Sequence, residues 1–166
     1  MNLRQWAGGL AFYGGAAALI GYFSAEPRYA PVPEGQGLLR VSIVHATQRR
    51  DACRERSAAE LAKLPPNMRA AQDCPRERSP MLVEVEVDGR LVLRREAQPS
   101  GLRRDGNAAL YERLVLPAGT HRVAARLRDR PGEGFDHARE DTVALRPGQA
   151  LLLDFNAAHG GFHFRD

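Results

Sequence analysis

The sequence predicts an all-β fold: an antiparallel β-sandwich of about seven strands with a short helical insert, preceded by one N-terminal transmembrane helix. Three observations lead to this prediction. An uncharged apolar run occupies residues 6–23, short segments with alternating apolar and polar residues follow it, and Gly, Pro or Asp-Gly turns separate those segments. No long helical period lies between them, so we expect the strands to form hairpins and two stacked sheets.

The run at residues 6–23 is long enough to cross a bilayer as a helix, about 27 Å against ~30 Å of hydrocarbon. We therefore interpret residues 1–24 as a membrane anchor. A cleaved secretory signal is an alternative, although bulky Phe23 disfavours cleavage after Ala25. A Gly/Ala-rich helix in the core of a soluble protein is another, although the run is apolar on every face.

Flanking charges predict an orientation for this helix. Arg4 precedes the apolar run and Glu26 is the first charge after it, so the positive-inside rule leaves the N-terminus in the cytoplasm. The predicted location is the inner membrane, single pass, with a periplasmic C-terminal domain. Small residues on one stripe of the helix would let a second transmembrane helix approach closely. They are Ala7, Ala11, Gly14, Ala18 and Gly21.

The rest of the chain has room for one domain. Residues 25–37 are rich in proline and glycine and predict a linker. Residues 38–166 then form the exported sandwich domain, with the helical insert at about 50–78.

Two cysteines lie within the insert. Cys53 and Cys74 are 21 residues apart, and an even count in an exported chain favours one disulfide. Such a bond removes about 3 kcal/mol of chain entropy from the unfolded state. Two free thiols, or a redox or metal pair, are the alternatives; structural zinc requires four ligands at recognisable spacings, which are absent from the sequence around these cysteines.

Local signals place the individual elements. Ser57 and Glu60 form a capping-box pattern, which predicts a helix over about 58–64 that ends at Pro65 and Pro66. Asp88-Gly89 is the strongest hairpin signal. Strands are expected at 38–46, 82–87, 90–95, 110–116, 120–128, 142–145 and 149–155, with a further short strand at 162–164.

One phrase carries a resemblance. Residues 116–123, LPAGTHRV, are similar to the turn-and-strand hairpin common in small bacterial envelope sandwich domains. The resemblance implies an immunoglobulin-like or transthyretin-like sandwich and no activity.

The net charge of +4 and the pI near 9.6 come almost entirely from arginine, since Lys63 is the only lysine. An exported domain does not meet the genome, so we expect no nucleic-acid partner. Anionic lipid headgroups or an acidic face of another envelope or inner-membrane protein fit better, with Arg122, Arg126 and Arg128 as candidate partner-binding residues. The alternative is that these arginines form a solvated face.

Histidines near the C-terminus are the candidate metal ligands. His137, His159 and His163 could offer imidazoles to copper or zinc. Gly160 and Gly161 argue against a helix that would bring the last two together, and terminal histidines without a role are common.

No catalytic residues are predicted, because no serine lies in a nucleophile motif and no phosphate-binding glycine loop is present. Glu84 and Glu86 share one face of a strand, where a solvated face opposite arginines is a simpler role than paired catalytic carboxylates.

The sequence therefore predicts a binding protein rather than an enzyme. The expected function is a membrane-anchored periplasmic interaction module, an accessory subunit or assembly factor of an envelope or inner-membrane complex. The alternatives are a metal-handling accessory protein that uses the C-terminal histidines, and a soluble exported ligand-binding domain if the N-terminal segment is cleaved.

Overall fold

The computed structural model describes residues 2–26 and 32–165 and divides the chain into two compact units, Met1–Pro33 and Glu34–Asp166. The middle of the predicted linker, residues 27–31, lies outside the described residues.

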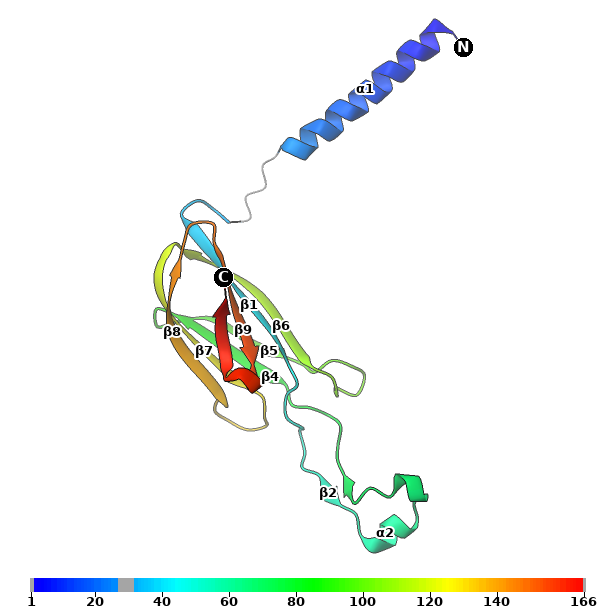
Figure 1. The fold of residues 1–166 in the computed structure, drawn as a ribbon, viewed down its shortest axis with the longest axis vertical. Coiled ribbons are helices and arrows are strands. Elements are labelled where there is room, and N and C mark those ends of the chain that lie inside the picture. Colours follow the sequence, from blue (N-terminus) through cyan, green and yellow to red (C-terminus); the bar gives the residue numbers. More distant parts are fainter. Residues whose placement is uncertain (1, 27–31, 166) are drawn as a thin grey trace. The chain divides into compact units, whose positions relative to one another are not determined.

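The first unit consists of one helix, α1, at Leu3–Ala25 (Figure 1). The predicted helix is present, but none of the helices within the described residues is long and apolar enough to span a membrane. The predictions of a transmembrane anchor and of an inner-membrane, single-pass location with a periplasmic domain are therefore wrong. The physical reason is composition: five glycines within α1 add almost no apolar surface, and Trp6, Tyr13 and Tyr22 carry polar groups.

The second unit is mostly β-sheet. In the described part of the chain its main body is two four-stranded sheets with the strand orders β10-β9-β1-β6 and β5-β4-β7-β8 (Figure 1). The strands are β1 (Gln36–His45), β4 (Met81–Val87), β5 (Arg90–Ala97), β6 (Ala108–Pro117), β7 (Gly119–Arg128), β8 (His137–Leu145), β9 (Ala150–Asn156) and β10 (Gly161–Arg165). The predicted all-β class is confirmed.

The prediction of a purely antiparallel arrangement needs correction. Strands β1 and β9 pair in parallel, with Leu38 opposite Ala150 and Ser42 opposite Asp154. These strands are far apart in the sequence, so no hairpin turn constrains their direction.

The core lies between the two sheets and follows from the alternation along the strands. Leu39, Val41 and Ile43 of β1 face Val83 and Val85 of β4, and all are buried. The strand β10 contributes Phe162, which is 1% exposed and packs edge-on against an aromatic ring of β9. None of the described residues between 44 and 80 belongs to this core.

The turns are built as their residues require. Asp88 and Gly89 have φ angles of 52° and 78°, the left-handed region that a tight hairpin between β4 and β5 needs. Several strand boundaries differ from the expectation by one or two residues; β1, for example, begins at Gln36, inside the predicted linker. The largest difference is at β8, which begins at His137 instead of Thr142, because an edge strand can carry polar residues at the rim of the sandwich.

The insert between β1 and β4 has its own small elements. These are β2 (Arg54–Glu55), α2 (Ala58–Ala62), a 3-10 turn η1 (Pro66–Met68) and β3 (Gln72–Asp73). The predicted insert helix is present but shorter than expected. A second 3-10 turn, η2 (Ala157–His159), connects β9 to β10.

Candidate functional site

The most distinctive feature of the described residues is the insert, which we call the arm and define as residues 49–78. In Figure 1 the arm carries α2 at its tip, away from the strands of the two sheets. Arg49 and Arg78 form an isolated β-bridge where the arm leaves the sandwich. The arm is therefore an excursion from the sheets with a narrow base.

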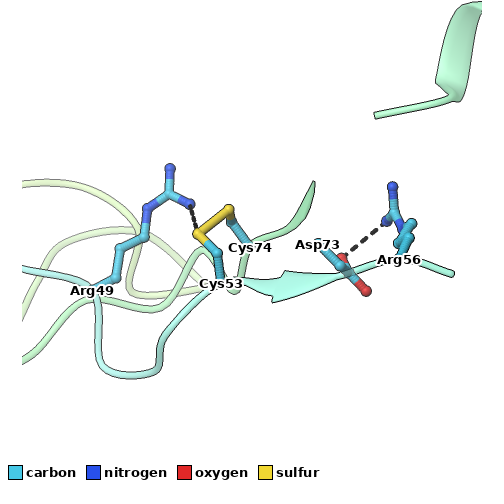
Figure 2. The surroundings of a disulfide bond; sticks show 5 residues. All are labelled: Arg49, Cys53, Arg56, Asp73 and Cys74. Atoms are coloured by element: carbon cyan, nitrogen blue, oxygen red, sulfur yellow. Dashed lines mark hydrogen bonds and ion pairs between the residues drawn. A yellow bond between two sulfur atoms is a disulfide. The ribbon is translucent and has the colours of Figure 1, made fainter. Parts of the chain in front are cut away.

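A disulfide closes the arm, as predicted. The sulfur atoms of Cys53 and Cys74 are bonded at 2.12 Å, with the two Cα atoms 4.2 Å apart (Figure 2). The guanidinium of Arg49 donates to Cys53 Sγ over 3.9 Å. Among the described residues no cysteine is free, so the thiol and metal-pair alternatives do not apply.

Buried polar groups fix the base of the arm to the sandwich. Thr47 Oγ1 donates to the carbonyl of Ser79 at 2.6 Å, and the Ser79 amide donates to the carbonyl of Gln48 at 2.8 Å. The Arg78 guanidinium donates to the carbonyls of Asp105, at 3.1 Å, and Thr47. This network orders the two segments of the chain that connect the arm to the sandwich. No periodic signal in the sequence identifies it.

Inside the arm, the predicted capping box at the start of α2 is formed. The Glu60 amide donates to Ser57 Oγ at 3.3 Å, and Glu60 Oε2 accepts from the Ser57 amide at 2.8 Å. The hydrogen bond from the Ser57 backbone, reinforced by one from Arg54, lowers the pKa of Glu60 to about 2. The carboxylate therefore stays ionised across the physiological range.

Ion pairs link the elements of the arm to one another. Arg54 contacts Glu60 at 2.9 Å and Asp73 at 3.4 Å, which ties α2 to the β2–β3 pair. Arg56, the residue that follows β2, contacts Asp73 of β3 at 3.0 Å (Figure 2). The pairs of Arg54 are exposed and that of Arg56 is partly buried, so each contributes little stability singly, but together they favour one geometry for the arm.

The arm carries an excess of positive charge, eight basic against five acidic residues. Lys63, Arg69 and Arg76 have no carboxylate partner within residues 2–26 and 32–165. Met68, between the first two of these in sequence, is 61% exposed. The arm thus presents an exposed apolar side chain and three cations without carboxylate partners, of which Lys63 and Arg69 flank Met68 in the sequence and Arg76 lies nearer the base.

The arginines predicted to bind a partner lie on the outer face of β7. Arg126 contacts Glu86 at 2.8 Å and Glu84 at 3.9 Å, and Arg122 contacts Glu140 at 2.6 Å. Two of the three predicted residues are therefore neutralised within their own sheet. The third, Arg128, has no ion pair in the described residues.

Glu84 and Glu86 each form an ion pair with an arginine of a neighbouring strand. Glu84 is 8% exposed and accepts from Arg94 at 3.1 Å, with Arg126 on its other side. The two carboxylates stabilise a cross-strand charge ladder on the outer face of the sheet.

The predicted metal ligands are on different elements. His159 lies in η2, His163 in β10 and His137 at the start of β8. His137 approaches Asp129 at 3.9 Å, and the same carboxylate accepts from His45 Nε2 at 2.6 Å. The described residues contain no group of three or more His, Cys, Asp or Glu side chains that could hold a metal ion.

A further histidine forms a clamp that the sequence does not reveal. His121 Nδ1 lies 2.7 Å from Asp88 Oδ2, and Nε2 lies 2.8 Å from the carbonyl oxygen of Pro117. Both partners are acceptors, an arrangement that the protonated imidazole satisfies with a hydrogen on each ring nitrogen. The Asp88 hydrogen bond raises the pKa of His121, and the same bond, with one from the Arg122 amide, lowers the pKa of Asp88.

The small-residue stripe predicted for membrane packing lies on α1. A methyl group built on Gly14 or Gly21 would meet nothing within 4 Å among the described atoms. The stripe of Ala7, Ala11, Gly14, Ala18 and Gly21 is accessible, but its predicted role between transmembrane helices is withdrawn with the anchor.

Comparison with protein-family models, with curated proteins and with solved structures gives no match. Function is therefore inferred from the geometry of the described residues.

Proposed function

We propose that this chain is a protein-interaction module, an accessory subunit or assembly factor of a larger complex, and that the arm contacts its partner. The immunoglobulin-like or transthyretin-like subtype of the sandwich stays a prediction. The arm carries the proposal: it is held in one conformation by a disulfide, a capping box and ion pairs, yet contributes nothing to the core among the described residues.

Ordering a surface excursion has a free-energy cost of about 1–2 kcal/mol per residue in backbone entropy. In α2 no described side chain is buried, so little of this cost is offset by burial of apolar area. The arm thus adds little to the stability of the sandwich. An ordered arm suits binding, because a partner then meets a preformed surface and the entropy of ordering is not lost on association.

The chemistry of the arm favours an acidic protein surface as the partner. Lys63, Arg69 and Arg76 supply unpaired positive charge, which raises the association rate with a negatively charged surface. Met68, next to Arg69 in the sequence, supplies a flexible apolar contact. Methionine and arginine are both enriched in protein interfaces.

Helix α1 supports membership of an assembly. Its large apolar side chains are exposed, among them Trp6 at 58%, Phe12 at 71% and Tyr13 at 73%. Apolar surface of this extent is typical of segments that pack against another protein. No observation favours the metal-handling alternative.

The proposal is tested by crosslinking from the arm. A photoreactive phenylalanine analogue at position 68 is expected to give one reproducible adduct in cells, identified by mass spectrometry. The same analogue at Leu102, a position outside the arm that is more exposed than Met68, is the control and should not give that adduct. Identical adducts from both positions would contradict the proposal.

Affinity is then measured between this protein and the purified partner. We expect the variant Lys63→Gln, Arg69→Gln, Arg76→Gln to bind at least about tenfold more weakly and with reduced salt dependence. The matched control neutralises three exposed arginines outside the arm, Arg90, Arg103 and Arg146. An equal loss in both variants would show that overall charge, not the arm, determines binding.

A further inference from the structure

A row of arginines crosses the outer face of the sheet β10-β9-β1-β6. Strand register places Arg40 directly opposite Arg113 of β6 and beside Leu152 of β9, and Leu152 is opposite Arg165 of β10. The residues on either side of Arg40, Leu39 and Val41, are buried in the core, so the arginines point outward.

This row is not neutralised within the sheet. Arg40 and Arg113 have no carboxylate partner in the described part of the chain, and Arg165 approaches Asp154 only at 3.9 Å. Like charges directly opposite each other in a sheet are destabilising. By contrast, Arg126 on the other sheet contacts two carboxylates, those of Glu84 and Glu86.

The surroundings of the row have the composition of an interface. Tyr111, two residues before Arg113 on the same face of β6, is 59% exposed, and Val115, two residues after it, is 46% exposed. Val44 of β1 is 61% exposed on the same face. Tyrosine and arginine are enriched where interface binding energy concentrates.

Strand β6 is also an edge. It pairs with β1 along one side over ten residues, and on its other side the described residues form a single backbone bridge, between Pro99 and Ala108. The one side-chain ion pair from β6 to the other sheet joins Glu112 to Arg95 of β5 at 3.1 Å within the described residues. The backbone groups along this free side are available to a further strand, the template that peptide-binding sheets offer.

We propose that β6 binds an extended acidic peptide segment of a partner protein as a fifth strand of this sheet. Every second side chain of that strand lies on the outer face, so an acidic residue opposite Arg113 is flanked by apolar residues opposite Tyr111 and Val115. Arg40, one strand further in, adds positive potential. The inference rests on the proposed interaction function but assigns a second surface, separate from the arm.

The test uses a fluorescein-labelled peptide, Thr-Val-Thr-Glu-Thr-Val-Thr, titrated with the full chain by fluorescence anisotropy at low salt. Arg113→Ala and Tyr111→Ala are each expected to weaken binding about tenfold, the effect of one charge-assisted hydrogen bond or one aromatic contact. Arg113→Glu is expected to reverse the preference, towards the same peptide with Lys in place of Glu. The control Arg122→Ala, an exposed arginine on the other sheet, should change affinity less than twofold.

Two further probes decide the mode of binding. A peptide N-methylated at alternate backbone positions should not bind, because it cannot pair with the edge of β6; equal binding overturns strand addition. The second probe is a single-stranded oligonucleotide. If it binds more tightly than the acidic peptide, and Arg113→Ala abolishes that binding, the row of arginines is a nucleic-acid site and the proposal is overturned.

Folding and the arm are controlled separately. Removal of Arg113 relieves its repulsion with Arg40, so the melting temperature of the variant should be unchanged or higher. A large fall in melting temperature would mean that the variant loses binding because it misfolds, which overturns the assignment of the lost binding to this surface. The arm variant at Lys63, Arg69 and Arg76 should bind the peptide normally. If the peptide does not bind while the arm still binds its partner, this inference is wrong and the proposed function is unaffected.

Discussion

Replacement of Cys53 and Cys74 by serine is expected to unfold the arm and leave the sandwich folded. The cysteines are 21 residues apart, and a cross-link of that span removes about 3 kcal/mol of entropy from the open chain. Without it, the arm's open population rises about a hundredfold. The remaining elements are a two-residue strand pair and a five-residue helix, both too short to be stable alone in water.

Two measurements, made on the wild-type protein and on the double serine variant, test this prediction. Amide hydrogen exchange should lose protection over residues 54–74 and keep it in the strands, because none of the described arm residues lies in the core. Thermal unfolding should shift by less than about 4 °C, the equivalent of roughly 1 kcal/mol for a domain of this size.

Either of two results would refute this reasoning. A fall of about 12 °C would mean that the full 3 kcal/mol acts on global stability and that the arm is part of the sandwich's cooperative unit. Undiminished protection of residues 54–74 would mean that ion pairs and the capping box order the arm without the disulfide.

Three further predictions concern the sandwich. Gly37→Ala should lower the melting temperature by about 4–12 °C, because the new methyl group would overlap the side chain of Leu145 and overpacking costs about 1–3 kcal/mol; differential scanning calorimetry would show no shift if that side chain simply moves aside. Phe162→Ala should cost about 3–5 kcal/mol in a urea titration, since the ring is 1% exposed, and a loss under 1 kcal/mol would mean that the core collapses around the gap. His121→Asn should destabilise most between about pH 4 and pH 6.5. Because the pKa of His121 is raised on folding, its contribution to stability is complete below the pKa of the unfolded state and is lost as pH rises through the pKa of the folded state. Because the pKa of Asp88 is lowered on folding, its contribution is lost as pH falls through the pKa of the folded state. A destabilisation, measured by thermal melting, that does not depend on pH would contradict the clamp.

Features that depend on neighbours in sequence could be predicted from the sequence. The Asp88-Gly89 hairpin and the Ser57–Glu60 capping box are local, and the disulfide follows from having two cysteines in one insert. The alternation of apolar residues predicts most strands because it records which side chains face the core.

Features that depend on distant pairing could not be predicted in the same way. The parallel pairing of β1 with β9, and the register that puts Arg40 opposite Arg113, arise only when the sheet is assembled. The sequence therefore indicates the arginines of β7, of which Arg122 and Arg126 pair with carboxylates, and does not indicate that Arg40 and Arg113 lie side by side. The membrane prediction is wrong for another reason: residues 6–23 carry no charge, but their glycines and polar aromatic rings leave the helix too little apolar surface.

The central claim, that the arm is an ordered binding element, is tested most directly by hydrogen exchange over residues 54–74 in the free protein and in its complex with the crosslinked partner. The account predicts measurable protection before binding, a further increase in the complex centred on residues 61–69, and no increase in the variant with Lys63, Arg69 and Arg76 neutralised. Unprotected amides in the free arm, or a complex that protects other surfaces and leaves the arm unchanged, would contradict it.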